Sequence, residues 1–308
     1  MRSSNRSESR SETLANRLDL LVRTDPPASR VLAIDIVQRE RAHRVLEPAL
    51  DVLSADPTPD IRPVLRERYA DLTDNGMRFD QDCSLRVKIV QLLRAIGSPN
   101  DVDLAERGVR LIQLNPPARV DVAQALRGQC LLLLSDISPE RAPYYAVELL
   151  HDPHQSVFSG EPAVTAIQVL AEHAQILPIW AVARRTGSHP DVLAQAFASL
   201  RRAPPDLQLD ALTLQLKDAA ERGEDGDGVA LVAAEAMVLN HLSGGYPAVI
   251  DLIRATINLN LYRYLLMTVA RDGDNLLREQ ILDSGKAEKN PARASILAEV
   301  YGLGRRSR

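Results

Sequence analysis

Apolar residues recur along much of the chain with the spacing of an α-helix that buries one face. In the clearest stretch they occupy positions i, i+4, i+7, i+8 and i+11, namely Leu85, Ile89, Leu92, Leu93 and Ile96. A second stretch nearly repeats this order with Val122, Leu126, Cys130, Leu133 and Leu134. Because this period places apolar side chains on one helical face, the pattern predicts a succession of amphipathic helices.

A short turn that starts with Asp or Asn followed by Pro separates successive helical runs. Its instances start at Asp25, Asp56, Asn115 and Asp152, and a looser copy starts at His189. The last three of these lie 37 positions apart, and 37 positions further on comes the turn-rich segment Glu224–Gly228. A regular period of this length is typical of repeat proteins.

Helix capping explains the residues of this turn. Asp or Asn accepts hydrogen bonds from free N–H groups at a helix start, and Pro fits the first helical turn because its missing N–H is no loss there. Runs such as Pro48–Leu53 and Pro143–Leu150 precede the turn, and a further helical run follows it. The predicted unit is therefore a helix, a turn and a second helix.

Residues 49–62 carry this pattern most completely, with a Leu-rich helix, the Asp56-Pro57 turn and then Ile61-Arg62 opening a second helix. This order resembles the HEAT repeat family. The resemblance implies an all-α fold, a right-handed α-solenoid of about seven to eight HEAT-like antiparallel helix pairs over residues 13–303, with roughly 40 residues in each pair.

The chain departs from the family pattern in three places. Phe158 stands where the pattern has Arg, and a longer connection covers Asn75–Asp82. After Gly244 the turn is missing until Asn290-Pro291, so the repeat boundaries there rest on helical patterning.

The composition agrees with closely packed helices. Apolar residues make up 45% of the chain but aromatic residues only 4%, so the core must come from Leu, Ala, Val and Ile. The polar residues 1–12 lack the apolar core of a signal peptide and predict a disordered N-terminal segment. Residues 304–308 predict a basic C-terminal tail.

The chain carries no sign of a membrane or secretory protein. Ala163–Ala183 is the most apolar stretch, but polar residues and Pro178 interrupt it, which favours two helices joined by a bend. Cys83 and Cys130 both lie in apolar helical patterns, where a free thiol behaves as a small hydrophobe. These features predict a cytoplasmic protein in a reducing compartment.

The charge distribution argues against nucleic acid as the main partner. The formal net charge is -4, and each half of the chain contributes -2. A nucleic-acid-binding protein usually shows a clustered positive footprint, because phosphate neutralisation dominates its affinity. Here such a footprint is restricted to a local stripe.

Candidate metal and cofactor motifs have simpler explanations. His151 and His154 lie three positions apart, yet a zinc site normally needs three or four protein ligands. The acidic loops at Glu224–Gly228 and Asp272–Asn275 lack the later oxygen ligands of a calcium loop. We expect turn and capping roles for these residues, with no metal and no cofactor.

Trp180, Arg184 and Arg185 suggest an alternative function. A lone aromatic beside two cations can stack on a base, and HEAT-like alkylpurine DNA glycosylases use aromatic and acidic residues in a basic concave groove. In the competing interpretation Trp180 packs between neighbouring repeats while the arginines extend outward. We favour the second interpretation, and no residue in the sequence is identified as a catalytic Asp.

The predicted function is a non-catalytic protein-binding scaffold or adaptor. The chain contains no Gly-x-Ser-x-Gly motif and no Gly-rich phosphate loop, whereas a stacked helical array offers an extended concave surface for a protein or peptide partner. The alternative is a HEAT-like DNA-binding protein or glycosylase. Polar positions on second helices supply the candidate groove residues: Arg86, Lys88, Arg94, Gln124, Arg127, Gln168 and Gln195.

Overall fold

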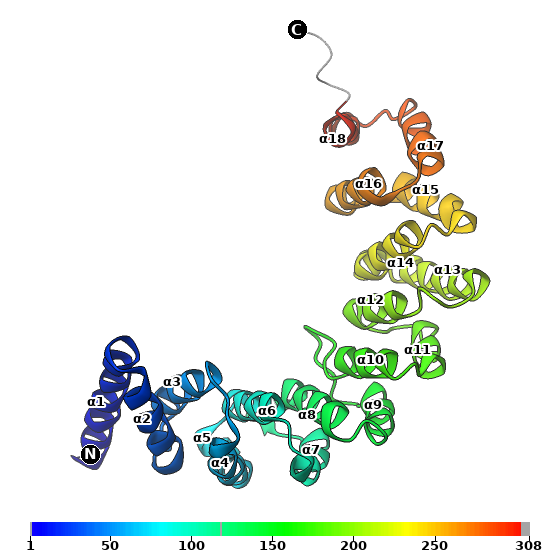
Figure 1. Cartoon of the computed structure of the whole chain (residues 1–308). Helices are drawn as coiled ribbons and strands as arrows, with labels where there is room; N and C mark the ends of the chain where they lie inside the picture. Colours follow the sequence, from blue (N-terminus) through cyan, green and yellow to red (C-terminus); the bar gives the residue numbers. More distant parts are fainter. Residues whose placement is uncertain (1, 118, 303–308) are drawn as a thin grey trace. The chain divides into compact units, whose positions relative to one another are not determined.

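The computed structural model describes residues 2–117 and 119–302, with side chains from residue 11 onward. This part of the chain is almost entirely helical (Figure 1), which confirms the predicted all-α class. Its strands are the two-residue β1 (Leu114–Asn115) and β2 (Val120–Asp121), which pair antiparallel. No helix in the described residues has both the length and the apolar character needed to cross a membrane.

The chain divides into two compact units. Unit 1 holds the described residues through Ser156 together with Glu161–Val169, and unit 2 holds Val157–Gly160 and the described residues from Leu170 onward. Helix α10 (Ala163–Glu172) contains the boundary. Helices α10 and α11 (Ile176–Ala183) match the two helices predicted for the apolar stretch after Pro162.

Unit 1 is built from helices that contact their neighbours in sequence. Contacts join α3 to α6 and α6 to α8, while α2 contacts α4 and α7 contacts α9, which gives two helical layers within the unit. Short 3-10 turns, η1 (Pro59–Ile61) and η2 (Pro99–Asp101), lead into α4 and α7. Its complete helices are α1 (Arg2–Thr24), α2 (Pro26–Arg39), α3 (His43–Ser54), α4 (Arg62–Asp74), α5 (Gly76–Phe79), α6 (Ser84–Ile96), α7 (Val102–Val109), α8 (Gln124–Ile137) and α9 (Ala142–Leu150).

Unit 2 has the same kind of connectivity. One layer contains α12, α14, α16 and α18, each in contact with the next, and a second layer contains α11 with α13 and α15 with α17. The 3-10 turns are η3 (Gly223–Gly226) and η4 (Ser243–Gly245). The helices that follow α11 are α12 (Pro190–Ser199), α13 (Pro205–Arg222), α14 (Asp227–Leu239), α15 (Tyr246–Ala255), α16 (Leu259–Asp272), α17 (Asn275–Gly285) and α18 (Pro291–Tyr301).

Polar contacts between helices of one layer show that these helices run parallel. At the start of α14 and α16, Asn258 Nδ2 donates to Asp227 at 2.7 Å, and towards their ends Arg271 lies 3.8 Å from Glu235. In unit 1 the start of α3 meets the start of α6, where His43 Nε2 lies 2.9 Å from Ser84 Oγ. Parallel helices in one layer require a helix of the other layer as the return connection.

Long polar side chains close the carboxyl ends of several helices. Arg68 donates to the Val37 carbonyl at 2.7 Å, and Gln215 donates to the Ala183 carbonyl at 2.8 Å. Arg293 reaches three carbonyls, those of Ile253, Arg254 and Thr256, at 2.7 to 3.1 Å. These carbonyls have no helical N–H partner, so a side chain from another helix of the same unit satisfies them.

Two of the predicted turns cap helices as expected. Asp25 accepts from the Ala28 N–H at the start of α2, with Pro26 as the first helical residue. Asn290 accepts from Ala292 and Arg293 N–H groups at the start of α18, with Pro291 first. The Asp-Pro and Asn-Pro motif therefore starts helices at both ends of the described chain.

Two other turns behave differently. Asn115-Pro116 lies in the β1–β2 hairpin, and α8 begins only at Gln124. Asp152-Pro153 leads into irregular backbone that extends to α10. At the N-terminus, the predicted disordered residues 2–12 have helical backbone as the first half of α1, while residue 1 and the predicted tail 304–308 lie outside the described residues.

Candidate functional site

A buried Asp–Arg pair forms the start of α6. Asp80 lies just before the helix and accepts from the Leu85 and Arg86 N–H groups at 3.0 and 3.2 Å. Arg86 Nε donates to the same carboxylate at 2.8 Å, and both side chains are buried. Asp80 thus satisfies free N–H groups at the start of α6 and pairs with Arg86, the first cationic residue of that helix. Arg86, one of the predicted groove residues, is buried in this pair.

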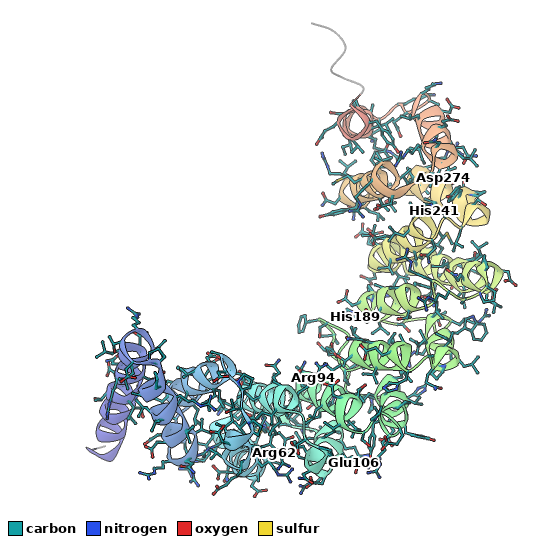
Figure 2. The ribbon with its side chains drawn as sticks, in the orientation of Figure 1. Arg62, Arg94, Glu106, His189, His241 and Asp274 are labelled. Carbon is teal, nitrogen blue, oxygen red and sulfur yellow. The ribbon has the colours of Figure 1, made fainter. Side chains whose placement is uncertain are left out.

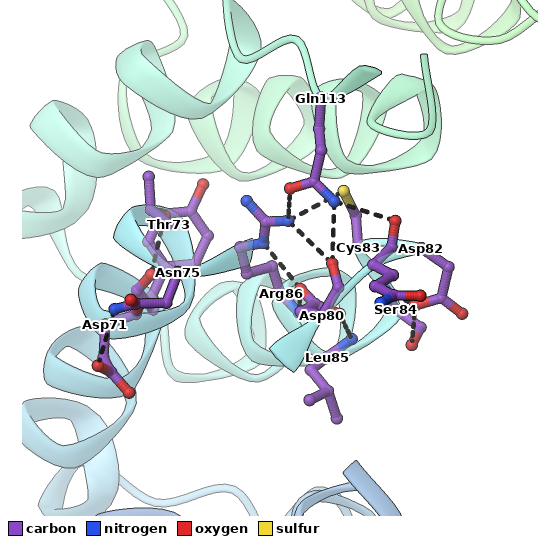
Figure 3. A network of polar contacts seen from close by, with 12 residues as sticks. Asp71, Thr73, Asn75, Asp80, Asp82, Cys83, Ser84, Leu85, Arg86 and Gln113 are labelled. Atoms are coloured by element: carbon purple, nitrogen blue, oxygen red, sulfur yellow. Dashed lines mark hydrogen bonds and ion pairs between the residues drawn. The ribbon is translucent and has the colours of Figure 1, made fainter. Parts of the chain in front are cut away.

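The other end of Arg86 reaches the segment after α7. Its Nη2 donates to Gln113 Oε1 at 2.5 Å and contacts Cys83 Sγ at 3.1 Å. Gln113 Nε2 in turn donates to the Asp80 carbonyl at 3.0 Å, which closes a ring of contacts (Figure 3). Within the described residues, Arg86 Nη1 has no hydrogen-bond acceptor, and Figure 3 draws that nitrogen directed away from Asp80 and Gln113.

Arg127 occupies the matching position on α8 and is also buried. It pairs with Asp121, six residues earlier, as Arg86 pairs with Asp80. Arg127 also donates to the Leu111 carbonyl at 3.0 Å and lies 2.8 Å from Asp152. Arg127, another of the predicted groove residues, is therefore buried among the turns around α8 and ties the helix to them.

A cleft opens beside Arg86 in unit 1. It has a volume of about 470 Å³ and lies between the end of α4, α5 and the segment after α7. Met77 and Ile112, which are 43% and 50% exposed, stand among its lining. Its charged lining residues are Arg78, Arg86 and Asp74. The lining thus combines exposed apolar side chains with charged groups of both signs.

Gly76 allows this arrangement. A Cβ at this position would lie 2.3 Å from Gln113 Oε1 and 2.8 Å from Arg86 Nη2. The backbone of α5 therefore rests directly on the Arg86–Gln113 contact, and a larger residue would displace it.

The remaining predicted residues of unit 1 lie on its surface. Lys88 forms ion pairs with Glu47 and Asp51 of α3, and Arg94 lies 2.5 Å from Asp136 of α8. Figure 2 places Arg94 on one side of the helices of unit 1, and Arg62 and Glu106 on the opposite side. These pairs tie successive helices of one layer together. Gln124 is half-buried at the start of α8, and Gln168 is exposed on α10.

Trp180 and its two neighbouring arginines are engaged within unit 2. The Arg184 guanidinium lies 5.1 Å from the centre of the Trp180 ring and also pairs with Asp210 of α13. Arg185 Nε donates to Ser188 Oγ at 3.3 Å. The indole is half-buried and its Nε1 has no hydrogen-bond partner in the described structure. Both arginines are therefore engaged in contacts within unit 2.

Helices α12, α14 and α16 carry exposed apolar side chains on a face that is open to solvent. Tyr264 and Met267 are 58% and 49% exposed on α16, and Leu239 is exposed at the end of α14. Between α12 and α14 lies a hollow of about 110 Å³. Its lining includes Ala194, Phe197, Ala198, Val232 and Leu239. We call this surface the α12–α16 face; Gln195, predicted as a groove residue, is half-buried on α12.

One cluster in the described residues has the spacing of a metal site. Single ligand atoms of His43, Asp80 and Asp82 lie within 4.8 Å of one another. Asp80, however, already accepts three hydrogen bonds from α6, and Asp82 accepts from Ser84 at 2.8 Å. These carboxylates serve as helix caps, so donors from α6 already occupy their oxygens.

Sequence comparison does not identify the chain. No protein-family model matches it, and no curated protein matches it in sequence.

Proposed function

We propose that this chain is a HEAT-like α-solenoid and acts as a non-catalytic, cytoplasmic scaffold that binds a segment of another protein. Support for the repeat comes from the ties between parallel helices. Lys88 and Asp51 are 37 residues apart, Arg94 and Asp136 are 42 apart, and Arg110 and Glu148 are 38 apart. These separations match the roughly 40 residues of a HEAT unit.

The α12–α16 face is the proposed binding surface. Its exposed Tyr264, Met267 and Leu239 combine with the ion pair between Arg271 and Glu235. Tyr, Met and Arg are the residue types enriched in protein interfaces, where an apolar centre is bordered by polar groups. Flexible Met side chains also adapt to the shape of a partner. An extended protein segment or a partner helix suits this face best.

The alternative function, nucleic-acid binding, receives less support. Arg184 is held by Trp180 and Asp210, and Arg185 is hydrogen-bonded to Ser188. Cations committed to internal contacts offer less to phosphate groups than free ones, and phosphate contacts dominate affinity for DNA.

Comparative affinity capture tests the proposal. The full chain and a Tyr264→Glu/Met267→Glu variant would be immobilised and exposed to native cell extract, followed by quantitative mass spectrometry. Leu276→Glu, at a position 54% exposed on α17, is the matched control. We expect one set of proteins to be retained by the wild type and the control and lost by the double variant.

Two results would count against the proposal. One is equal recovery of the same proteins by the double variant, which would place binding elsewhere. The other is the lack of any reproducibly retained protein when circular dichroism shows all three chains to be folded.

A further inference from the structure

The only Asn-Gly pair in the sequence, Asn75-Gly76, lies where α4 ends and α5 begins. Asn75 is exposed, and its backbone angles, φ -122 and ψ 22, depart from those of the helices on either side. Glycine has no Cβ to shield its backbone nitrogen or to restrict the chain beside it. The side chain of an asparagine that precedes glycine is therefore unusually open to attack by that nitrogen.

The packing around Gly76 requires a glycine at this position. An added Cβ would lie 2.3 Å from Gln113 Oε1 and 2.8 Å from Arg86 Nη2. Both of these side chains are buried, and Asp80 holds them in place through its carboxylate and its carbonyl. The contact between Arg86 and Gln113 therefore imposes the residue that makes Asn75 reactive.

The side-chain amide of Asn75 is directed at oxygen acceptors. Its Nδ2 donates to the Asp71 backbone carbonyl at 3.0 Å and lies 3.4 Å from Asp71 Oδ1. An ionised carboxylate accepts hydrogen bonds but has no hydrogen to donate. Conversion of the Asn75 amide into an acid therefore removes both contacts and leaves oxygen facing oxygen.

We propose that Asn75 is a site of spontaneous deamidation, which alters the junction of α4 and α5 as the protein ages. The backbone nitrogen of Gly76 attacks Asn75 Cγ, the bond from Cγ to Nδ2 breaks, and ammonia leaves with the proton of the attacking nitrogen. A succinimide ring remains. One water molecule then opens this ring at either carbonyl, which gives aspartate or isoaspartate with one new negative charge.

The two products disturb unit 1 in different ways. Aspartate keeps the backbone intact but loses the donor contacts to Asp71. Isoaspartate routes the backbone through the former side chain and so adds a carbon atom between residues 75 and 76. This added length displaces Gly76 from its place against Arg86 and Gln113. Either product therefore weakens the attachment of α5 to the start of α6.

Peptide mass spectrometry of the aged full chain tests the proposal. The protein would be incubated at mildly alkaline pH and physiological temperature, with samples digested under acidic conditions and isoaspartate detected by enzymatic methylation. We expect the mass gain of an amide-to-acid conversion first in the peptide that holds Asn75. Asn100 and Asn260 are internal controls, since both are exposed but precede residues with side chains. The urea midpoint of the aged protein should fall below that of a fresh sample.

Three variants separate the chemistry from its structural effect. Asn75→Gln keeps an amide on a longer side chain that closes the ring less readily, so its mass and urea midpoint should stay constant during incubation. Asn75→Asp reproduces one product and should lower the midpoint of a fresh sample. Asn260→Asp, at an exposed position in the first turn of α16, should not lower it, because the helix dipole favours an acid there.

The proposal fails if the Asn75 peptide keeps its amide mass, or if Asn100 and Asn260 convert at the same rate. A wild-type midpoint in fresh Asn75→Asp, together with an unchanged midpoint in the aged protein, would refute the effect on unit 1. Neither measurement involves capture through the α12–α16 face, so these failures leave the proposed function standing.

Discussion

Arg62 and Asp101 lie 39 residues apart and form a two-point ion pair, with Nε and Nη2 of the arginine 3.0 and 2.9 Å from the two carboxylate oxygens. Asp101 also accepts from Arg66 Nη1 at 2.6 Å, and its side chain is fully buried. The carboxylate therefore joins the start of α4 to the start of α7 through two cations.

Removing this charge should destabilise unit 1. Asp101→Asn leaves two guanidinium groups without their buried partner, and breaking a buried pair in this way costs about 3 kcal/mol or more. Urea unfolding followed by circular dichroism measures the effect. Asp103→Asn, at an exposed carboxylate that also contacts Arg66, is the control and should cost less than about 1 kcal/mol. Equal losses in both variants would contradict the special role of Asp101.

A glycine on α7 should resist substitution although it lies within a helix. A Cβ on Gly108 would lie 2.3 Å from Cys130 Sγ and 2.7 Å from Tyr69 Oη. Overpacking costs roughly 1–3 kcal/mol and exceeds the gain of about 1 kcal/mol in helix propensity. Gly108→Ala should therefore lower the free energy of unfolding. Gly228→Ala, exposed on α14, should change stability by less than about 1 kcal/mol, and the reverse order would contradict the prediction.

Both thiols should be inert in the folded chain. Cys83 and Cys130 are fully buried, and burial raises the pKa of each thiol to about 12. Because the thiolate is the reactive form, we expect no modification by a disulfide reagent at pH 8 under native conditions. Both cysteines should react in denaturant. Rapid native labelling of either thiol would show that the helices packed around it open readily.

Stability should fall at alkaline pH because of Tyr246. Its hydroxyl donates to Asp274 at 2.8 Å, and burial together with this contact raises the pKa of Tyr246 to about 12. Below the unfolded pKa of about 10 both states keep the proton, so the contribution is fully present there. Between about pH 10 and 12 the unfolded chain loses its proton first, and stability declines as the pH rises.

A Phe variant isolates this effect. Tyr246→Phe should flatten the pH dependence of the urea midpoint in the alkaline range, while Tyr144→Phe, at an exposed ring, should not. The same contact helps to lower the pKa of Asp274, after the Leu277 N–H as the larger cause. His241, which Figure 2 places near Asp274, adds a smaller effect in the same direction. An unaltered alkaline profile in Tyr246→Phe would contradict the assignment.

Duplex DNA should not bind measurably even at low salt. The cations beside Trp180 are held by Asp210 and Ser188, and the chain is acidic overall. Fluorescence anisotropy with a labelled duplex provides the measurement. Tight binding that weakens steeply as salt rises would support the nucleic-acid alternative, because released counterions produce that slope.

Helical spacing was enough to predict the main elements. The apolar series from Leu85 to Ile96 corresponds to α6, and Asp25-Pro26 starts α2 as expected. The prediction that Asn115-Pro116 directly precedes a helix was wrong, because these residue types also suit the turn of a β-hairpin. Asp121 accepts from the Gln113 and Ala123 N–H groups, which closes the hairpin and delays the start of α8. Whether Asn115 starts a helix or a hairpin therefore depends on the side chain of Asp121, six residues further along the chain.

The candidate site was harder to predict than the fold. Arg86 follows Leu85 on α6, and a polar residue beside an apolar position is normally assigned to the surface. Its burial depends on two hydrogen-bond acceptors. One is the carboxylate of Asp80, just before the helix, and the other is the side-chain oxygen of Gln113, 27 residues further along the chain. One signal was present in the sequence: Asp80 with Arg86 and Asp121 with Arg127 share the same separation of six residues.

The closure of helix ends by arginine and glutamine has a consequence for chemical labelling. Arg293 satisfies three carbonyls with one planar group, which the single ammonium of a lysine reproduces poorly. The lysines of the chain are Lys88, Lys217, Lys286 and Lys289, and among them Lys88 pairs with a neighbouring helix. Amine-reactive dyes or surface coupling should therefore leave the helix-end contacts intact, whereas dicarbonyl reagents directed at arginine should report on whether those ends are open.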